Sequence, residues 1–148
     1  MNTHPYWRAY MAASVVPTIF LLVVLTAFVV VRFVLQAPVP IERIIVFPMA
    51  LAPNLFGIWN VLYQRLSRQR SFPIGLHGAI LPFVMAPLAY TLAHGLGFVS
   101  HTPNGLLWFG LVEEPYAWIV FGICVAVCVY YLVWKYIVDF FNRTLGIA

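Results

Sequence analysis

Long runs of apolar residues, separated by short polar segments, dominate the pattern of this 148-residue chain. A helix needs about 20 mostly apolar residues to cross the hydrocarbon core of a bilayer, which is about 30 Å thick. The runs are continuous, whereas the strands of a transmembrane barrel would alternate apolar and polar positions. The pattern therefore predicts an all-α membrane protein. The stretches long enough to span are residues 11–35, 44–66, 74–99 and 115–137.

The connections between these stretches are mostly too short to hold a further domain. Short connections join antiparallel neighbours. We therefore expect a single transmembrane domain over residues 1–148, folded as a four-transmembrane-helix, up-down-up-down bundle. The longest connection, residues 100–114, has an apolar middle. We expect its segment 104–112 to lie at the membrane interface.

Composition and charge support this membrane assignment. Hydrophobic residues make up 64% of the chain and charged residues only 8%, compared with roughly 25% charged residues in soluble domains. The net charge of +4 would suggest a nucleic-acid partner in a soluble protein, but here the basic residues fall at the ends of the spans. We expect no nucleic-acid partner, and we expect the lipid bilayer to be a partner.

The positions of the basic residues predict the orientation. Most of them lie at the two termini and in the loop between the second and third stretches, and cytoplasmic segments carry an excess of Lys and Arg. We therefore expect both termini to be cytoplasmic, in a plasma or inner membrane. Basic residues at span ends also suit contacts with anionic lipid head groups. The predicted head-group contacts are Arg65, Arg68, Arg70, Lys135 and Arg143.

Small residues recur every three or four positions along the third stretch. This spacing places them on one helix face, and in lipid a small face lets another helix backbone approach closely. We expect this face to form a homo-oligomer or to join a larger membrane complex. Pro82 and Pro87 lie in the same stretch and should bend it. The small face comprises Gly75, Ala79, Ala86, Ala93 and Gly97.

Polar side chains are scarce within the spans, and carboxamides in hydrocarbon must find partners there. If the second and third stretches run antiparallel from their shared loop, Asn54 lies at about the depth of Tyr90, with His94 about one turn further along. This depth count predicts an intramembrane polar cluster. Its groups either satisfy one another, or line a site for a solute, lipid or quinone, or hold a metal or haem. The cluster comprises Asn54, Asn60, Tyr90, Thr91 and His94.

Cofactors are not expected from the sequence, and no metal ligand is assigned. Imidazole can ligate haem, but His77 and His94 lie 17 residues apart, about 25 Å along one helix, so they cannot share one haem. A homodimer that pairs His94 with its symmetry mate leaves haem open as an alternative. Cys124 and Cys128 lie one helical turn apart and leave a soft-metal site with His94 open, although buried cysteine also packs as a small apolar residue.

The acidic pair Glu113 and Glu114 directly precedes the fourth stretch. Carboxylates are favoured near the amino end of a helix, so we interpret the pair as capping that helix. The alternative makes the two carboxylates, with His101 and Asn104, a cation-binding or enzymatic site. The sequence does not decide whether this segment is functional.

The expected function follows from what the chain offers and what it lacks. No acidic residue lies deep in a span, whereas ion-coupled transporters usually place ionisable groups there. No nucleophile accompanied by a base is recognisable, so we expect no enzymatic activity and assign no catalytic residue. The leading hypothesis is a non-enzymatic accessory, assembly or scaffolding component of a membrane complex. The alternatives are an oligomeric carrier or channel for a neutral or lipid-like solute, and a quinone- or haem-binding membrane anchor.

Overall fold

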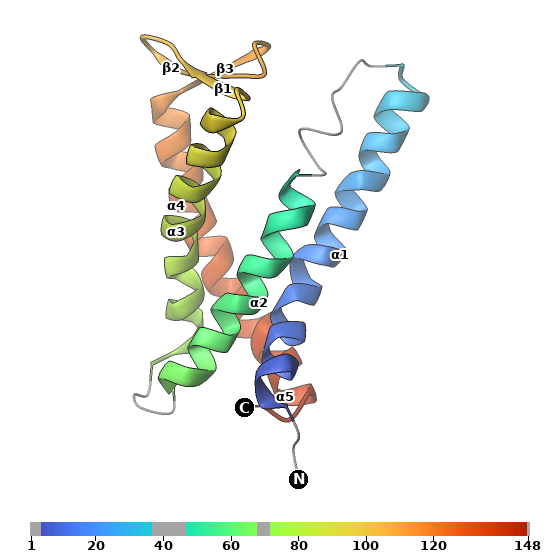
Figure 1. Ribbon diagram of the computed structural model, residues 1–148, viewed down its shortest axis with the longest axis vertical. Coiled ribbons are helices and arrows are strands. Elements are labelled where there is room, and N and C mark those ends of the chain that lie inside the picture. The colour runs from blue at the N-terminus through green and yellow to red at the C-terminus, as the bar shows by residue number, and fades with distance from the viewer. Residues whose placement is uncertain (1–3, 37–46, 68–71, 148) are drawn as a thin grey trace. The chain divides into compact units, whose positions relative to one another are not determined.

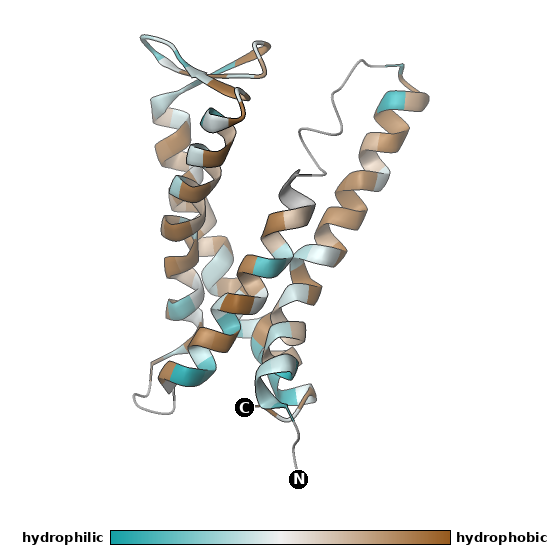
Figure 2. Ribbon diagram, in the orientation of Figure 1, coloured by the Kyte–Doolittle hydropathy of each residue, from teal (hydrophilic) through white to brown (hydrophobic). Residues whose placement is uncertain are grey.

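The computed structural model describes residues 4–36, 47–67 and 72–147. Helices dominate and make up 77% of the structure, and three of the described helices are long and apolar enough to cross a membrane (Figures 1 and 2). A small β-sheet accompanies them, so the fold is mostly helical, as predicted, but not all-α. The second predicted span forms a helix but is not among these three candidates, and the four-span bundle stays a prediction.

The chain divides into two compact units. The first unit comprises residues 1–72 and 136–148, and the second unit comprises residues 73–135. Each unit has its own way of holding its helices together, and the two are described separately below.

The first unit contains α1 (Pro5–Phe33), α2 (Phe47–Ser67) and α5 (Asp139–Thr144). Helix α1 begins six residues before the predicted span because Pro5 occupies the first turn, where a proline loses no hydrogen bond. Small side chains bring the helices together: Ala9, Ala12 and Ala13 are all at most 1% exposed.

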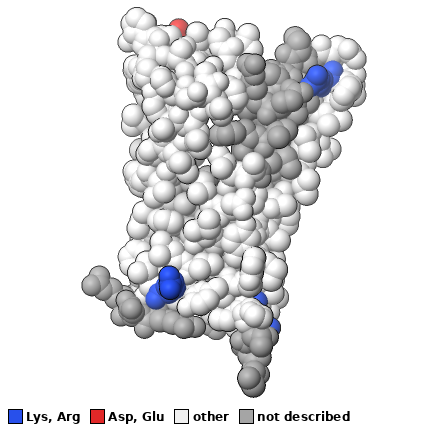
Figure 3. Space-filling view, viewed as in Figure 1, with Lys and Arg blue, Asp and Glu red and all other residues white. Residues whose placement is uncertain are grey.

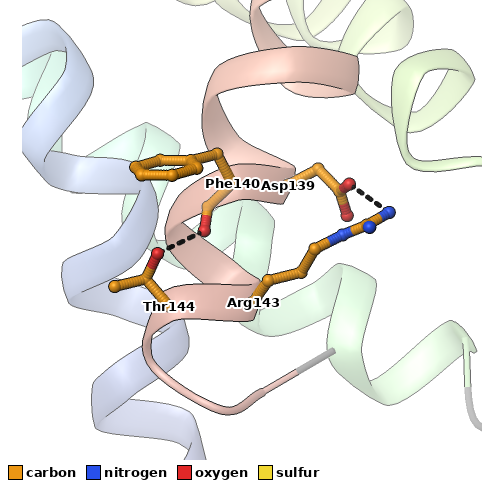
Figure 4. Close-up of polar contacts among 4 residues, drawn as sticks. All are labelled: Asp139, Phe140, Arg143 and Thr144. Atoms are coloured by element: carbon orange, nitrogen blue, oxygen red, sulfur yellow. Dashed lines mark hydrogen bonds and ion pairs between the residues drawn. The ribbon is translucent and has the colours of Figure 1, made fainter.

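Helix α5 ends the first unit with a polar turn (Figure 4). Asp139 and Arg143 form an ion pair of 2.7 Å across one turn. The carboxylate lies in the first turn and the guanidinium in the last, and both positions suit the helix dipole. The hydroxyl of Thr144 donates a hydrogen bond of 2.9 Å to the carbonyl of Phe140.

The second unit begins with α3 (Ile74–Gly95), which includes Pro82 and Pro87. The helix ends four residues before the predicted limit because a glycine-based cap closes it. Gly97 has φ +70°, the amide of Phe98 donates to the carbonyl of Ala93 at 2.8 Å, and the amide of Gly97 donates to the carbonyl of His94 at 3.0 Å. These bonds form a Schellman motif, in which a glycine in the left-handed region satisfies the last carbonyls.

An antiparallel three-stranded sheet follows, in the order β1-β2-β3. The strands are β1 (Val99–His101), β2 (Gly105–Trp108) and β3 (Val112–Pro115). Phe109 and Gly110 both have positive φ angles, which suit the tight turn of a hairpin. The segment predicted to lie at the interface therefore forms β2 and this turn. Leu106 of this segment is buried with Val99 of β1 against Ala93 of α3, whereas Leu111 and Val112 are exposed. The interfacial location of the segment stays a prediction.

The chain then enters α4 (Tyr116–Leu132), which continues through the π-helical segment η2 (Val133–Val138). Glycines of α3 lie directly under aromatic rings at this end of the second unit. A Cβ atom on Gly78 would overlap the side chain of Trp134, and one on Gly75 would come within 2.8 Å of the ring of Tyr131. The small face of α3 is therefore used, at least in part, inside the second unit.

Candidate functional site

A cluster of two histidines and two tyrosines lies where α3, the sheet and α4 meet. Tyr90 and His94 are one turn apart on α3, and such a pair projects from the same helix face. His101 ends β1 and Tyr116 begins α4. The ring centroids of Tyr90, His94 and His101 are each 5.8–5.9 Å from the other two. We call these four residues the Tyr–His cluster.

Hydrogen bonds order this cluster around His101. The hydroxyl of Tyr90 lies 2.5 Å from Nε2 of His101, and Nδ1 of the same ring lies 3.4 Å from the hydroxyl of Tyr116. The Tyr116 hydroxyl donates in turn to the carbonyl of Thr102 at 3.4 Å. A consistent direction along this chain puts the proton on Nδ1 and the lone pair on Nε2. The lone pair then points toward Tyr90.

The two carboxylates of β3 are held by the sheet rather than by α4. Glu113 accepts a hydrogen bond of 2.6 Å from the hydroxyl of Thr102, and Glu114 accepts one of 2.9 Å from the indole of Trp108. Pro115 caps α4, and the first turn of that helix has no acidic residue. The interpretation of the acidic pair as a helix cap is therefore wrong, because the residues pair across strands that the sequence pattern did not reveal.

An apolar groove of about 420 Å³ lies next to the Tyr–His cluster, between α3 and α4 and beneath β2. This size falls within the range typical of small-molecule sites, about 300–1,000 Å³. A second groove of about 340 Å³ shares part of the same wall. No charged residue lines the larger groove within the described part of the chain. Its lining includes Pro82, Ala86, Ala89, Tyr90, Trp108 and Ile123.

The electrostatics of this region are set by the distribution of charge along the chain. Residues 73–134 contain no Lys or Arg, and their only formal charges are the carboxylates of Glu113 and Glu114. Little charge appears on the face of the molecule drawn in Figure 3. The groove and the Tyr–His cluster therefore lie in a segment that has no lysine or arginine to bind an anion.

The predicted polar cluster is divided between the two units. Asn54 belongs to the first unit, where its carboxamide pairs with the hydroxyl of Tyr10 and with the carbonyl of Ala50. Thr91 belongs to the second unit and donates to the carbonyl of Pro87 at 2.8 Å. Within the second unit Tyr90 and His94 are in contact, as their spacing predicted. A joint cluster of all five residues stays a prediction.

Asn60 makes a buried polar contact in the first unit. Its partner is Asn142, which the sequence pattern did not indicate. Nδ2 of Asn60 donates to Oδ1 of Asn142 at 2.7 Å and to the carbonyl of Ala9 at 2.8 Å, and Asn142 returns a bond of 3.2 Å. Both asparagines are at most 1% exposed. No local pattern marks Asn142, since its partner lies 82 positions away.

The predicted head-group residues have varied surroundings. The guanidinium of Arg65 lies 5.9 Å from the ring centroid of Tyr6, the amine of Lys135 lies 5.6 Å from that of Tyr131, and Arg143 pairs with Asp139. Arg68 and Arg70 lie outside the described residues. The head-group contacts themselves stay predictions.

The predicted small face and the cysteines complete the set of candidate residues. Ala93 is buried beneath the sheet, whereas a Cβ atom on Gly97 would meet open space. Cys124 and Cys128 are both exposed and not bonded to each other. Among the described residues, no group of three His, Cys, Asp or Glu side chains lies close enough together to hold a metal ion.

Comparisons with known proteins give no relative for this chain: no family model, no curated protein and no solved structure matches it.

Proposed function

We propose that this protein is a non-enzymatic integral membrane protein that binds a neutral, lipid-like molecule between α3 and α4. The apolar groove of about 420 Å³ beside the Tyr–His cluster carries this proposal. Two helices that are long and apolar enough to span a membrane form its walls, so lipid-soluble molecules can reach it from the bilayer. Ligand sites are commonly apolar clefts with a few convergent polar groups, and here Tyr90 belongs to both the groove and the cluster.

The charge of the region supports a neutral ligand. An anionic phospholipid head group would need Lys, Arg or several free donors, and residues 73–134 supply no Lys or Arg. A neutral glyceride or a quinone carries an apolar body and carbonyl or hydroxyl oxygens, and these oxygens can hydrogen-bond to tyrosine and histidine. A protein with such a site would act as a carrier of neutral or lipid-like solutes, or as a quinone-binding membrane anchor.

The membrane arrangement belongs to the same proposal. We expect α2 to complete a four-span bundle, with both termini on the cytoplasmic side of a plasma or inner membrane. The distribution of Lys and Arg supports this orientation.

A second candidate function, an accessory or scaffolding role, is favoured by the exposed apolar helix faces. In the most apolar stretch of each helix, only 11% of the residues of α1 and 6% of those of the continuous helix Tyr116–Thr144 are buried. Lipid covers such faces in a protein that acts alone, and neighbouring helices cover part of them in a complex. Ala79 and Ala86, which are only partly buried, would then contribute to a contact with another copy or another subunit.

Native mass spectrometry with matched lipids tests the proposed ligand site. The protein in detergent is incubated separately with dioctanoylglycerol, with its phosphate ester, dioctanoyl phosphatidate, and with a short-chain quinone. We expect one-to-one adducts with dioctanoylglycerol or the quinone, and the preferred ligand distinguishes the two neutral classes. Phosphatidate should bind at least about tenfold more weakly, which corresponds to about 1.4 kcal/mol.

A groove-filling variant and a matched control locate the binding. Ala89→Phe places a ring in the groove, since Ala89 lines it, and should abolish the adduct. Ala117→Phe makes the same change at an exposed position in the first turn of α4 and should leave binding intact. Equal binding of phosphatidate, or equal adduct levels in Ala89→Phe and wild type, would contradict the proposal.

A further inference from the structure

We infer that Tyr90, His94 and His101 form a binding site for a divalent transition-metal ion such as Cu²⁺ or Zn²⁺. The inference does not depend on the proposed lipid-like ligand: Tyr90 also lines the groove, but His94 and His101 do not, and the test uses metal ions alone. Imidazole nitrogen is the commonest side-chain ligand for these metals. The phenol oxygen of Tyr90 is a third possible ligand, and its contact with His101 already holds it beside that ring.

The geometry brings three donor side chains to one point. The ring centroids of His94 and His101 are 5.9 Å apart, and the hydroxyl of Tyr90 lies 2.5 Å from Nε2 of His101. Metal–nitrogen bonds of about 2.0–2.1 Å place two ligating imidazoles at comparable separations. The two rings are therefore close enough for both to ligate one ion. Both histidines are exposed at the surface of the protein, so no described side chain covers them.

The hydrogen-bonding chain leaves the correct nitrogen available. His101 is oriented by its Nδ1 contact with Tyr116, which is 3.4 Å long. Histidines that bind metals almost always donate their other ring N–H to such a partner, which fixes the ring and the tautomer. The lone pair of His101 Nε2, which accepts the hydroxyl proton of Tyr90 when no metal is bound, can then bind the metal instead. When Tyr90 ligates Cu²⁺ as a phenolate, the phenolic proton is released to water as the metal–oxygen bond forms.

The surrounding charge favours a cation. The segment 73–134 has no Lys or Arg and carries the carboxylates of Glu113 and Glu114 on the strand next to β2. A divalent ion therefore meets no fixed positive charge on the elements that surround the cluster, which are α3, the sheet and the start of α4. With two imidazoles and one phenol as protein ligands, water completes the coordination. Such a site binds an exchangeable ion rather than a permanent structural one.

Titration with Cu²⁺ tests the site, because copper binds imidazole sites most strongly among the divalent ions of its row and its complexes are coloured. Tag-free protein in detergent is first stripped with a chelator and then titrated with Cu²⁺ while absorption is recorded. We expect one equivalent to bind, with a visible phenolate-to-copper charge-transfer band. Mg²⁺ and Ca²⁺, which prefer oxygen ligands, should not compete, whereas Zn²⁺ should.

Variants assign the ligands. His94→Ala and His101→Ala should each weaken binding by more than about tenfold, and Tyr116→Phe by roughly tenfold through loss of ring orientation. Tyr90→Phe should remove the charge-transfer band. His4→Ala is the matched control, since His4 is an exposed histidine of the first unit, and it should bind Cu²⁺ as wild type does.

Electron paramagnetic resonance of the wild-type copper complex keeps the inference testable even where a variant fails to fold. Two bound imidazole nitrogens should split the copper signal into the superhyperfine pattern of two ¹⁴N nuclei. A spectrum from one nitrogen, or affinity that falls in His4→Ala but not in His94→Ala or His101→Ala, would overturn the inference.

Discussion

The two units differ in the contacts that join their helices. In the first unit, buried carboxamides bond across helices, as in the Asn60–Asn142 pair, which also reaches the backbone of Ala9. In the second unit, glycines of α3 let aromatic rings of α4 and η2 lie against the backbone, with Gly78 under Trp134 as the closest case. The first unit also has one glycine–aromatic contact, Gly57 against the ring of Tyr10. Among the described residues, the units therefore differ in that the first adds a buried carboxamide pair between its helices.

The difference extends to what each unit leaves free. Among the described residues, the first unit uses its carboxamides internally, because Asn54 and Asn60 both have partners on neighbouring elements. The second unit packs one end of α3 tightly and leaves a groove near the other end, beside Tyr90. Candidate ligand chemistry therefore belongs to the unit in which α3 packs on its neighbours through glycines and aromatic rings.

The largest expected effect comes from Gly78→Ala. The added methyl group meets Cβ and Cγ of Trp134, which are the rigid stem of that side chain. Overpacking of this kind costs about 1–3 kcal/mol, and we expect faster hydrogen–deuterium exchange in residues 73–135. The control Gly122→Ala adds the same methyl group where nothing lies within 4 Å, and it should not speed exchange. Equal effects of the two variants would show that α3 is not packed against Trp134.

Loss of the buried carboxamide pair should destabilise the first unit to a similar or slightly smaller extent. Asn60→Leu or Asn142→Leu leaves one buried amide without its partner, which costs about 1–3 kcal/mol. The free energy of unfolding, measured by denaturant titration, should fall in each variant. The double variant should be more stable than the sum of the two losses predicts, since directly contacting residues couple by about 0.5–3 kcal/mol. Strict additivity would argue against the bond.

A smaller loss is expected from Tyr10→Phe. This change removes the hydroxyl that bonds Asn54 but keeps the ring that lies against Gly57. Interhelical hydrogen bonds in membrane proteins average about 0.6 kcal/mol, and the midpoint of unfolding should fall accordingly. Thr26→Val removes a hydroxyl that bonds the carbonyl of Leu22 in its own helix, and it should cost less. The reverse order would show that the Tyr10 hydroxyl does not join α1 to α2.

The smallest effect should follow from Asp139→Asn at the ion pair of α5. The guanidinium of Arg143 is 74% exposed and the carboxylate side chain 22% exposed, so water screens the attraction. Exposed pairs one helical turn apart contribute about 0.3–0.5 kcal/mol, and the difference from wild type should shrink as salt is added. A salt-independent loss above this range would mean that the pair is more sheltered than its exposure indicates.

The sequence predicted the helices better than the segments between them. Continuous apolar runs place α1, α3 and α4 within a few residues, because an apolar run of about 20 residues can hardly form anything else in a membrane protein. The sheet was missed since β1, β2 and β3 have only three or four residues each, too few for an alternating pattern. The glycine cap at Gly97 is a local signal that could have placed the end of α3.

The candidate site was only partly accessible from the sequence. Tyr90 and His94 are four residues apart, so helical spacing predicted that they lie together. His101 and Tyr116 join them only because the sheet folds back between α3 and α4, and Asn60 meets Asn142 across 82 positions. Depth counting along helices assigns a level in the membrane but not a partner, so the bond between Tyr10 and Asn54 was not predicted.

Photolabelling of the reconstituted protein with a diazirine-bearing diacylglycerol tests the central claim most directly. Because exposed faces of α1 and α4 also meet lipid, the informative quantity is the excess of label on groove residues such as Pro82, Ala89 and Ile123 over the label on α1. We predict a clear excess in wild type and in Ala117→Phe, and its loss in Ala89→Phe. Even labelling of α1, α3 and α4, unchanged by Ala89→Phe, would contradict the claim that the groove binds a neutral lipid-like molecule.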